Sequence, residues 1–299
     1  MNGGRRPGTE GVVRELIVNA DDFGLDAAVN EAIERAHRNG ILASASLMVS
    51  GRACGDAVKR ARDMPSLRVG LHVVLTNGRA ILPARVLPAI VDASGCFRKN
   101  LLAAGIAYFL LPAARAQLEA EVRAQFQAFA ETGLQLDHVN AQNHMHVHPT
   151  VLSVLMKVGR EFGARAVRLP REPFWPSWRA AHTQGLSRLG NSVGLAPWLF
   201  FLRRRLQYAG FVYNDYLFGM NDTGHVTAPR VCRLLDVLPA GVTELYVHPA
   251  THAWPGAEPP DYDFAGELAA LIDPEVIERL QGPAIRRITF SELAQRRAT

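Results

Sequence analysis

Two adjacent carboxylates, Asp21 and Asp22, directly follow the apolar run Leu16-Ile17-Val18. Such a run predicts a buried strand, and the alternation of side chains along it would point one carboxylate inward and the other aside. One carboxylate could then bind a metal ion while its neighbour handles a proton, an arrangement that suggests a metal-dependent hydrolase. The alternative for Asp22 is an Asx-turn residue before Phe23-Gly24.

Histidines accompany two later apolar runs. His72 interrupts the predicted strand Val69–Leu75, and His144, His146 and His148 form an HxHxH run. In an extended segment these three would project onto one face, where clustered imidazoles need partners, and a metal ion or an anionic or sugar substrate would supply them. The alternatives are a hydrogen-bonded core histidine for His72 and a solvated loop for the HxHxH run.

The candidates lie at the ends of predicted strands that alternate with helices. This alternation predicts a single-domain α/β fold with parallel strands, an irregular (β/α) barrel. Chemistry in such barrels gathers at the carboxyl ends of the strands. The predicted strands are Arg14–Asn19, Ala45–Val49, Val69–Leu75, one that ends near Asn140, Ala166–Leu169 with Arg168 near its end, and Val242–Val247, which His248 follows. The predicted helices run from an N-cap at Asp26 to Gly40, through Val58 and Ala61, over 115–131 and over Val151–Phe162.

Domain boundaries follow from the same pattern. Residues 1–13 are Gly-rich and charged and are predicted to be loose, while residues 14–299 form the barrel domain with an apolar and basic insertion around 173–240. Within it, Leu195–Val212 runs from Trp198, Phe200 and Phe201 into three consecutive arginines. That make-up is typical of an element at an anionic membrane surface, and the alternative is a lid helix packed on the barrel.

Composition limits the function classes. The 299 residues carry a formal charge of +5, which favours anionic surfaces, but the basic residues form no long patch interleaved with aromatics, so nucleic acid is not expected as a partner. Three distant cysteines, Cys54, Cys96 and Cys232, read as reduced thiols and favour the cytoplasm. We find no signal-peptide h-region and no apolar run of about 20 residues. Composition gives no oligomeric state.

Five stretches together resemble the YdjC-like carbohydrate deacetylases, the family that contains chitooligosaccharide deacetylases. They are LIVNADDFGLDAAVNEAI, VGLHVVLTNG, LDHVNAQNHMHVHP, VRLPREP and ELYVHPA, which cover most of residues 14–172 and recur near 243–250. The resemblance implies a barrel of the polysaccharide-deacetylase-like kind. HVNAQNHMHVHP and VRLPREP most resemble the hopanoid-biosynthesis-associated (HpnK) branch, which implies an N-acetylglucosaminyl hopanoid lipid as substrate. A soluble chitooligosaccharide deacetylase and a non-catalytic sugar- or lipid-binding protein are the alternatives.

The resemblance also implies roles for individual residues. Asp22 and His72 would be metal ligands and Asp21 the general base. The family's third ligand is a histidine two residues beyond an Asp or Asn, but this chain has Gln142 at that position. Either Gln142 coordinates the ion, or His144 does, or metal binding is impaired. Mixed carboxylate and imidazole ligands suit one divalent ion, with zinc or magnesium favoured over nickel and manganese.

The remaining site residues complete a hydrolytic mechanism. His248 is the expected general acid for the leaving amine, with a structural turn before Pro249 as the alternative. Arg168 would pair with Asp21 and keep it ionised, unless it is a surface arginine. His146 and Glu172 are expected to contact sugar hydroxyls or groups around the metal ligands. We therefore predict a cytoplasmic deacetylase, peripheral on the inner face of the membrane if its amino sugar is part of a glycolipid.

Overall fold

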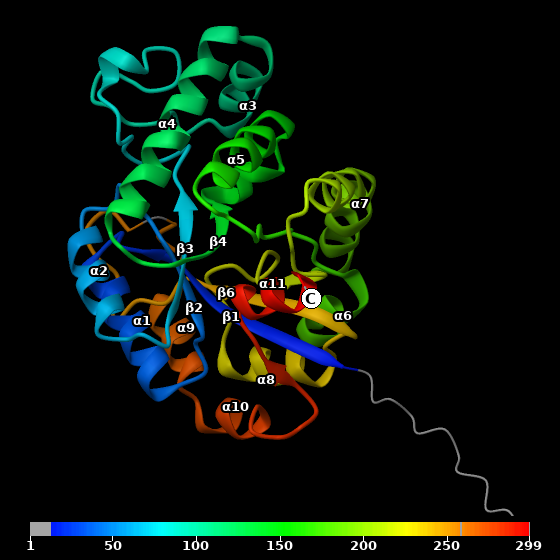
Figure 1. Ribbon diagram of the computed structural model, residues 1–299. Helices are drawn as coiled ribbons and strands as arrows, with labels where there is room; N and C mark the ends of the chain where they lie inside the picture. The colour runs from blue at the N-terminus through cyan, green and yellow to red at the C-terminus, as the bar shows by residue number, and fades with distance from the viewer. Residues whose placement is uncertain (1–12, 258, 299) are drawn as a thin grey trace, which may run out of the picture.

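The computed structural model describes residues 13–257 and 259–298, and it shows a curled parallel sheet surrounded by helices (Figure 1). The strand order is β4-β3-β2-β1-β6-β5, and β7 pairs with β1. The predicted loose N-terminus lies outside the described residues, apart from Val13. The strands are β1 (Arg14–Phe23), β2 (Ser44–Leu47), β3 (Arg68–Val73), β4 (Leu136–Ala141), β5 (Tyr216–Phe218), β6 (Gly241–Val247) and β7 (Arg286–Arg287).

Single residue pairs continue the sheet between β4 and β5. Val139 of β4 forms a parallel bridge with Val167, and Ala166 forms another with Val212, shortly before β5. The predicted strand Ala166–Leu169 is therefore present only as these bridges. They carry backbone hydrogen bonds such as Val139 N–H to the Ala166 carbonyl at 2.9 Å. The predicted irregular α/β barrel is confirmed, and its irregularity lies in this segment.

Helices cover the outside of the sheet. Asp26 caps α1 as predicted, since its side chain accepts a hydrogen bond from Ala28 N–H. Gly40 follows the end of α1 as predicted, and a larger residue would not fit there because its Cβ would lie 2.1 Å from the Leu271 carbonyl oxygen. The helices are α1 (Ala27–Asn39), α2 (Cys54–Arg62), α3 (Leu101–Leu110), α4 (Pro112–Glu131), α5 (Pro149–Glu161), α6 (Phe174–Ala181), α7 (Gly185–Tyr208), α8 (Ala228–Asp236), α9 (Phe264–Leu271), α10 (Pro274–Arg279) and α11 (Phe290–Ala298), with short 3₁₀ turns at η1 (Ala84–Val86) and η2 (Gln142–Val147).

The predicted insertion around 173–240 contains helices α6 and α7 and then β5 and α8, of which β5 belongs to the sheet. The Leu195–Val212 segment lies mostly in α7, whose Leu199, Leu202 and Leu206 are buried. Trp198 Nε1 donates a hydrogen bond to the Val147 carbonyl at 3.0 Å. One side of α7 is thus packed on the domain, as the lid-helix alternative predicted.

Among the described residues, no helix is by itself long and apolar enough to cross a membrane. Helices α3 and α4 satisfy the length and composition criteria only as a pair, and they are bent by 107° at their junction.

Candidate active site

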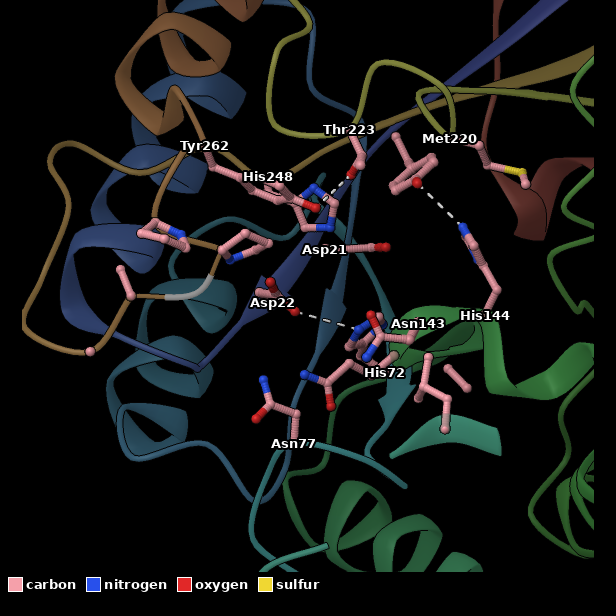
Figure 2. A pocket seen from close by; sticks show the side chains of 18 residues that line it. Asp21, Asp22, His72, Asn77, Asn143, His144, Met220, Thr223, His248 and Tyr262 are labelled. Atoms are coloured by element: carbon pink, nitrogen blue, oxygen red, sulfur yellow. Dashed lines mark hydrogen bonds and ion pairs between the residues drawn. The ribbon is translucent and has the colours of Figure 1, made fainter. Parts of the chain in front are cut away.

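A cleft of about 820 Å³ opens at the carboxyl ends of the strands (Figure 2). Three of the predicted site residues, Arg168, His146 and Glu172, are not part of its lining. The side chains from β1, β3, η2 and β6 converge there, as expected for a parallel barrel. Six predicted residues line the cleft: Asp21, Asp22, His72, Gln142, His144 and His248.

The two carboxylates diverge because β1 is irregular at its end. The register with β2 shifts between Ala20 and Phe23, and Asp22 adopts a left-handed backbone with φ of 66°. Strand alternation was therefore the wrong reason for their divergence. The turn that follows uses the Asp22 backbone carbonyl, which accepts from Leu25 N–H at 2.9 Å. The Asp22 carboxylate instead faces the cleft, unlike the Asx-turn alternative.

Asp21 is buried and densely hydrogen-bonded. Arg168 donates two hydrogen bonds to its carboxylate, from Nη1 to Oδ2 at 2.6 Å and from Nη2 to Oδ1 at 2.9 Å. Burial by itself raises the pKa of Asp21, but the Arg168 charge, the nearby His72 and the Arg168 hydrogen bonds outweigh it and hold the pKa well below its usual range. Asp21 is therefore ionised and fixed in orientation. Oδ1 also accepts bonds from Asn19, Ser46 and Asn140.

Arg168 lies between two carboxylates inside the barrel. Besides Asp21, it binds Glu244 through Nη2 at 2.7 Å and Nε at 3.0 Å. Its guanidinium carbon lies 4.7 Å from the centre of the Tyr246 ring, and the side chain is fully buried. The predicted contact with Asp21 is present, and the surface-arginine alternative was wrong.

The hydrogen bonds of Asn140 determine which His72 nitrogen carries a proton. Asn140 Nδ2 donates to Asp21 and to Ser46, so its Oδ1 must be the atom that lies 2.7 Å from His72 Nδ1. His72 Nδ1 is then the donor, and a neutral His72 has its lone pair on Nε2. That Nε2 lies 3.4 Å from Asp22 Oδ1, so two acceptors would face each other unless a cation relieves the repulsion.

This pair of atoms suits a shared metal ion. Two ligand atoms bound at about 2.0–2.2 Å to one tetrahedral zinc ion lie roughly 3.3–3.5 Å apart, which matches the separation of 3.4 Å. The Asn140 bond to Nδ1 is also the kind of contact that orients a metal-binding imidazole. A proton on Nε2, which would make a simple ion pair, is the alternative.

A third ligand does not come from the usual residue types. Among the described residues, no three His, Cys, Asp or Glu side chains form a group that could hold a metal ion. Gln142 Oε1 is buried in the cleft and has no hydrogen-bond partner within the described part of the chain. His144 Nε2 instead lies 3.2 Å from the Tyr246 hydroxyl, apart from the Asp22–His72 pair in Figure 2. His144 therefore does not form a group with Asp22 and His72 among the described residues, and Gln142 as third ligand stays a prediction.

The HxHxH run is not extended. It lies in η2, where Asn143 and His144 both have φ of 51°, so the three rings do not share one face and that prediction was wrong. His146 is buried behind the cleft, where burial and then the Arg168 charge lower its pKa to about 3. His148 precedes α5 at its N-cap position.

His248 follows β6 and lines the cleft beside two tyrosines. Its ring centre lies 5.4 Å from that of Tyr246 and 5.5 Å from that of Tyr262. Its backbone N–H donates to the buried Glu267 carboxylate. Figure 2 shows Asp21 and Asp22 between His248 and His72. The imidazole thus lines the cleft and follows Val247, which pairs with Ala20 just before Asp21, a position that a turn residue alone would not require.

Glu172 lies in a different place from the other predicted residues. It lines a second pocket of about 250 Å³ that shares Met220 with the cleft. Its carboxylate accepts hydrogen bonds from the Ser177 hydroxyl and from Asn221 N–H. Arg188 lies 3.6 Å away. These contacts are structural, and the predicted contact with substrate stays a prediction.

Sequence reasoning missed several polar residues of the site. Glu244 is an acidic residue inside the apolar strand β6, which is itself a signal of a buried partner. Asn19 gives the same signal in β1. Tyr246, Tyr262 and Thr223 line the cleft, but their types carry no comparable signal.

The sequence matches the family described as YdjC-like protein over residues 15–282. This span includes 173–240, which the five motifs left largely outside the resemblance. A carbohydrate deacetylase from Geobacillus stearothermophilus is 32% identical over 282 residues, which are 93% of this chain and 98% of that protein. One from Brevibacillus brevis is 38% identical over 148 residues, which are 50% of this chain and 56% of that protein.

The fold has a solved counterpart. An Enterococcus faecalis protein, described only as a candidate for cellobiose-phosphate cleavage, superposes with a TM-score of 0.71 over 94% of this chain and 99% of that one. The two sequences are 22% identical. At this identity the likeness establishes the fold alone.

Proposed function

Because this chain belongs to the YdjC-like protein family, we propose that it is a carbohydrate deacetylase that uses one divalent metal ion to hydrolyse the acetamido group of an amino sugar. The relatives from Geobacillus and Brevibacillus carry the name carbohydrate deacetylase. The observation that carries the proposal is the Asp22–His72 pair, in which Asp22 Oδ1 and His72 Nε2 lie 3.4 Å apart.

Asp22, His72 and Gln142 would hold the ion. Two of them offer oxygen, a ligand type that suits magnesium, whereas the separation of 3.4 Å matches tetrahedral zinc. A bound divalent ion lowers the pKa of its water towards about 7 and polarises the acetyl carbonyl.

Asp21 is the general base of the proposed reaction. Its Oδ1 accepts hydrogen bonds from several donors, whereas Oδ2 accepts one from Arg168, so Oδ2 takes the proton of the attacking water. A carboxylate with so low a pKa holds that proton only briefly. Arg168 keeps the carboxylate in one orientation throughout, and Glu244 holds Arg168 from its other side.

His248 is the general acid. As the carbon–nitrogen bond of the acetamide breaks, the leaving nitrogen needs a proton, and the cleft-lining imidazole supplies it. The products are acetate and the free amine. Tyr246 and Tyr262 pack against the ring and limit its rotation.

We propose an N-acetylglucosaminyl hopanoid lipid as the substrate, on the likeness of HVNAQNHMHVHP and VRLPREP to the hopanoid-associated branch. A soluble chitooligosaccharide is the alternative substrate, and a sugar- or lipid-binding protein without turnover is the alternative function. Gln142 in the usual histidine position is the observation that keeps the last one open.

Acetate release tests the proposal. Metal-replete protein is incubated with the glycolipid and with chitooligosaccharides, with and without a chelator. We expect chelator-sensitive acetate from the glycolipid. Release from chitooligosaccharides alone would replace the substrate, and no release from any N-acetylated sugar would favour the binding protein.

Gln142→His tests the third ligand. We expect tighter metal retention, because an imidazole would replace a weakly donating amide oxygen. The exposed helical change Gln127→His is the matched control and should leave retention unchanged. Equal metal affinity in wild type and Gln142→His would show that residue 142 does not reach the ion.

A further inference from the structure

Two helices direct large apolar side chains to the outside of the molecule. They are α3 and α7, which rise on either side of α5 on one side of the sheet (Figure 1). Leu102 is 74% exposed and Leu186 is 88% exposed. We call the set the α3/α7 face, and it comprises Leu102, Ile106, Phe109 and Leu110 of α3 and Leu186, Leu189, Val193 and Phe200 of α7.

Helical periodicity separates this face from the buried one. In α3 the exposed positions lie opposite Ala104 and Tyr108, which are buried. In α7 they lie opposite Leu199, Leu202 and Leu206, which pack on the domain. Each helix is therefore apolar on two sides, although only one side has a partner in the described chain. Exposed apolar side chains gathered in this way mark a candidate interaction site.

The charge around the face is mainly basic. Residues 94–118, which contain α3, include Arg98, Lys99 and Arg115 but no Asp or Glu. Around α7, Arg204 is exposed and Arg205 donates to Ser153, whereas Arg203 lies 3.7 Å from Asp215. Glu119 is the acidic residue in the depression between the two helices. A second copy of the chain on this face would bring like charges together, whereas anionic lipid would compensate them.

The face is continuous with the reaction cleft. Leu101, the first residue of α3, lines the cleft. Leu195 of α7 lines the second pocket, which shares Met220 with the cleft. Phe109 of α3 and Arg205 of α7 border one depression at the start of α5. A surface that covered the α3/α7 face would therefore lie beside the entrance to the site.

We propose that the α3/α7 face docks on an anionic lipid bilayer, with its leucines and phenylalanines in the headgroup boundary and the flanking arginines and lysine on lipid phosphates. This deepens the proposed function and rests on it for the link to a lipid-borne amino sugar. The docking itself needs no substrate and is tested without one.

Vesicle flotation of the full chain tests the docking. The probes are vesicles of equal parts phosphatidylglycerol and phosphatidylcholine, and vesicles of phosphatidylcholine alone. We expect binding to the anionic vesicles that weakens at high salt. The combined change Leu102→Gln, Ile106→Gln and Leu110→Gln should lower the partition coefficient at least about tenfold. The combined change Leu186→Gln, Val193→Gln and Phe200→Gln should do the same.

Val13→Gln is the control, since Val13 is an exposed apolar residue at the other end of β1, and it should leave binding unchanged. Thermal melting confirms that each variant is folded. No binding by the wild type, equal binding by all variants, or a stable dimer that the α3 changes dissociate would overturn the proposal. Acetate release from the glycolipid and from soluble N-acetylated sugars, measured in parallel, separates the two claims. Vesicle binding without release from any of them by metal-replete protein would overturn the deacetylase function and leave the docking intact.

Discussion

Arg168 and Arg188 are both buried arginines that bind carboxylates, yet they lie in different surroundings. Arg168 joins Asp21 of β1 to Glu244 of β6 inside the barrel. Arg188 joins α7 to the domain through Asp222 at 2.5 Å, with Glu172 at 3.6 Å. The Arg168 network of ion pairs includes Asp21, which lines the reaction cleft. The Arg188 network instead holds α7 on Glu172 and Asp222.

The difference shows how the same interaction serves two purposes. Around Asp21 the opposing charges outweigh burial, so its pKa is lowered and the carboxylate stays ionised. Around Glu172 burial outweighs its hydrogen bonds, and its pKa is raised. Arg168 therefore prepares a carboxylate for chemistry, whereas Arg188 anchors α7.

The largest expected effect is on turnover. Asp21→Asn should lower kcat about 10²–10⁴-fold, the usual contribution of a general base, whereas Glu172→Gln should leave kcat within about threefold. Acetate release by equal amounts of folded, metal-replete protein measures both. A comparable loss in the two variants would mean that the second network also takes part in catalysis.

The two arginines should separate stability from activity. Arg168→Met removes the cation that pairs with two buried carboxylates, which costs about 3–5 kcal/mol of unfolding free energy. Arg188→Met should cost less, because Arg230 still lies 3.3 Å from Asp222. Urea denaturation measures this cost. Turnover per folded molecule should fall in Arg168→Met only. If Arg188→Met lost turnover as strongly while its metal content stayed the same, the division between the networks would be refuted.

The smallest effect is a pair of opposite pH dependences. Stability from Asp21, whose folded pKa is lowered, is present above its unfolded value of about 3.9 and is lost as the pH falls through the folded value. Stability from Glu172, whose folded pKa is raised, is fully present below the unfolded value of about 4.3 and is lost as the pH rises through the folded value.

Denaturation at a series of pH values measures the slope of unfolding free energy against pH for each carboxylate. The stability difference between wild type and Asp21→Asn should shrink as the pH falls below about 4. The difference between wild type and Glu172→Gln should shrink as the pH rises above about 4. Slopes of the same sign would contradict the assignment of the two carboxylates.

Strand-end positions were predictable, and local backbone geometry was not. Parallel strands bring their carboxyl ends to one edge, so Asp21, His72 and His248 could be placed together from the sequence. The left-handed backbone of Asp22 and the turn over His144 depend on local hydrogen bonds that periodicity does not report. The Arg168–Glu244 bond joins residues 76 positions apart and depends on the barrel's register. The outward leucines of α3 look like core residues in the sequence, because composition does not tell which side of a helix is covered.

Metal content is the most direct measurement of the central claim, that Asp22 and His72 share one cation. Elemental analysis of the purified wild type, Asp22→Asn and His72→Gln should find one bound divalent ion per chain in the wild type and almost none in either variant. Equal metal content in all three proteins, or no metal in the wild type after incubation with zinc and magnesium, would contradict it.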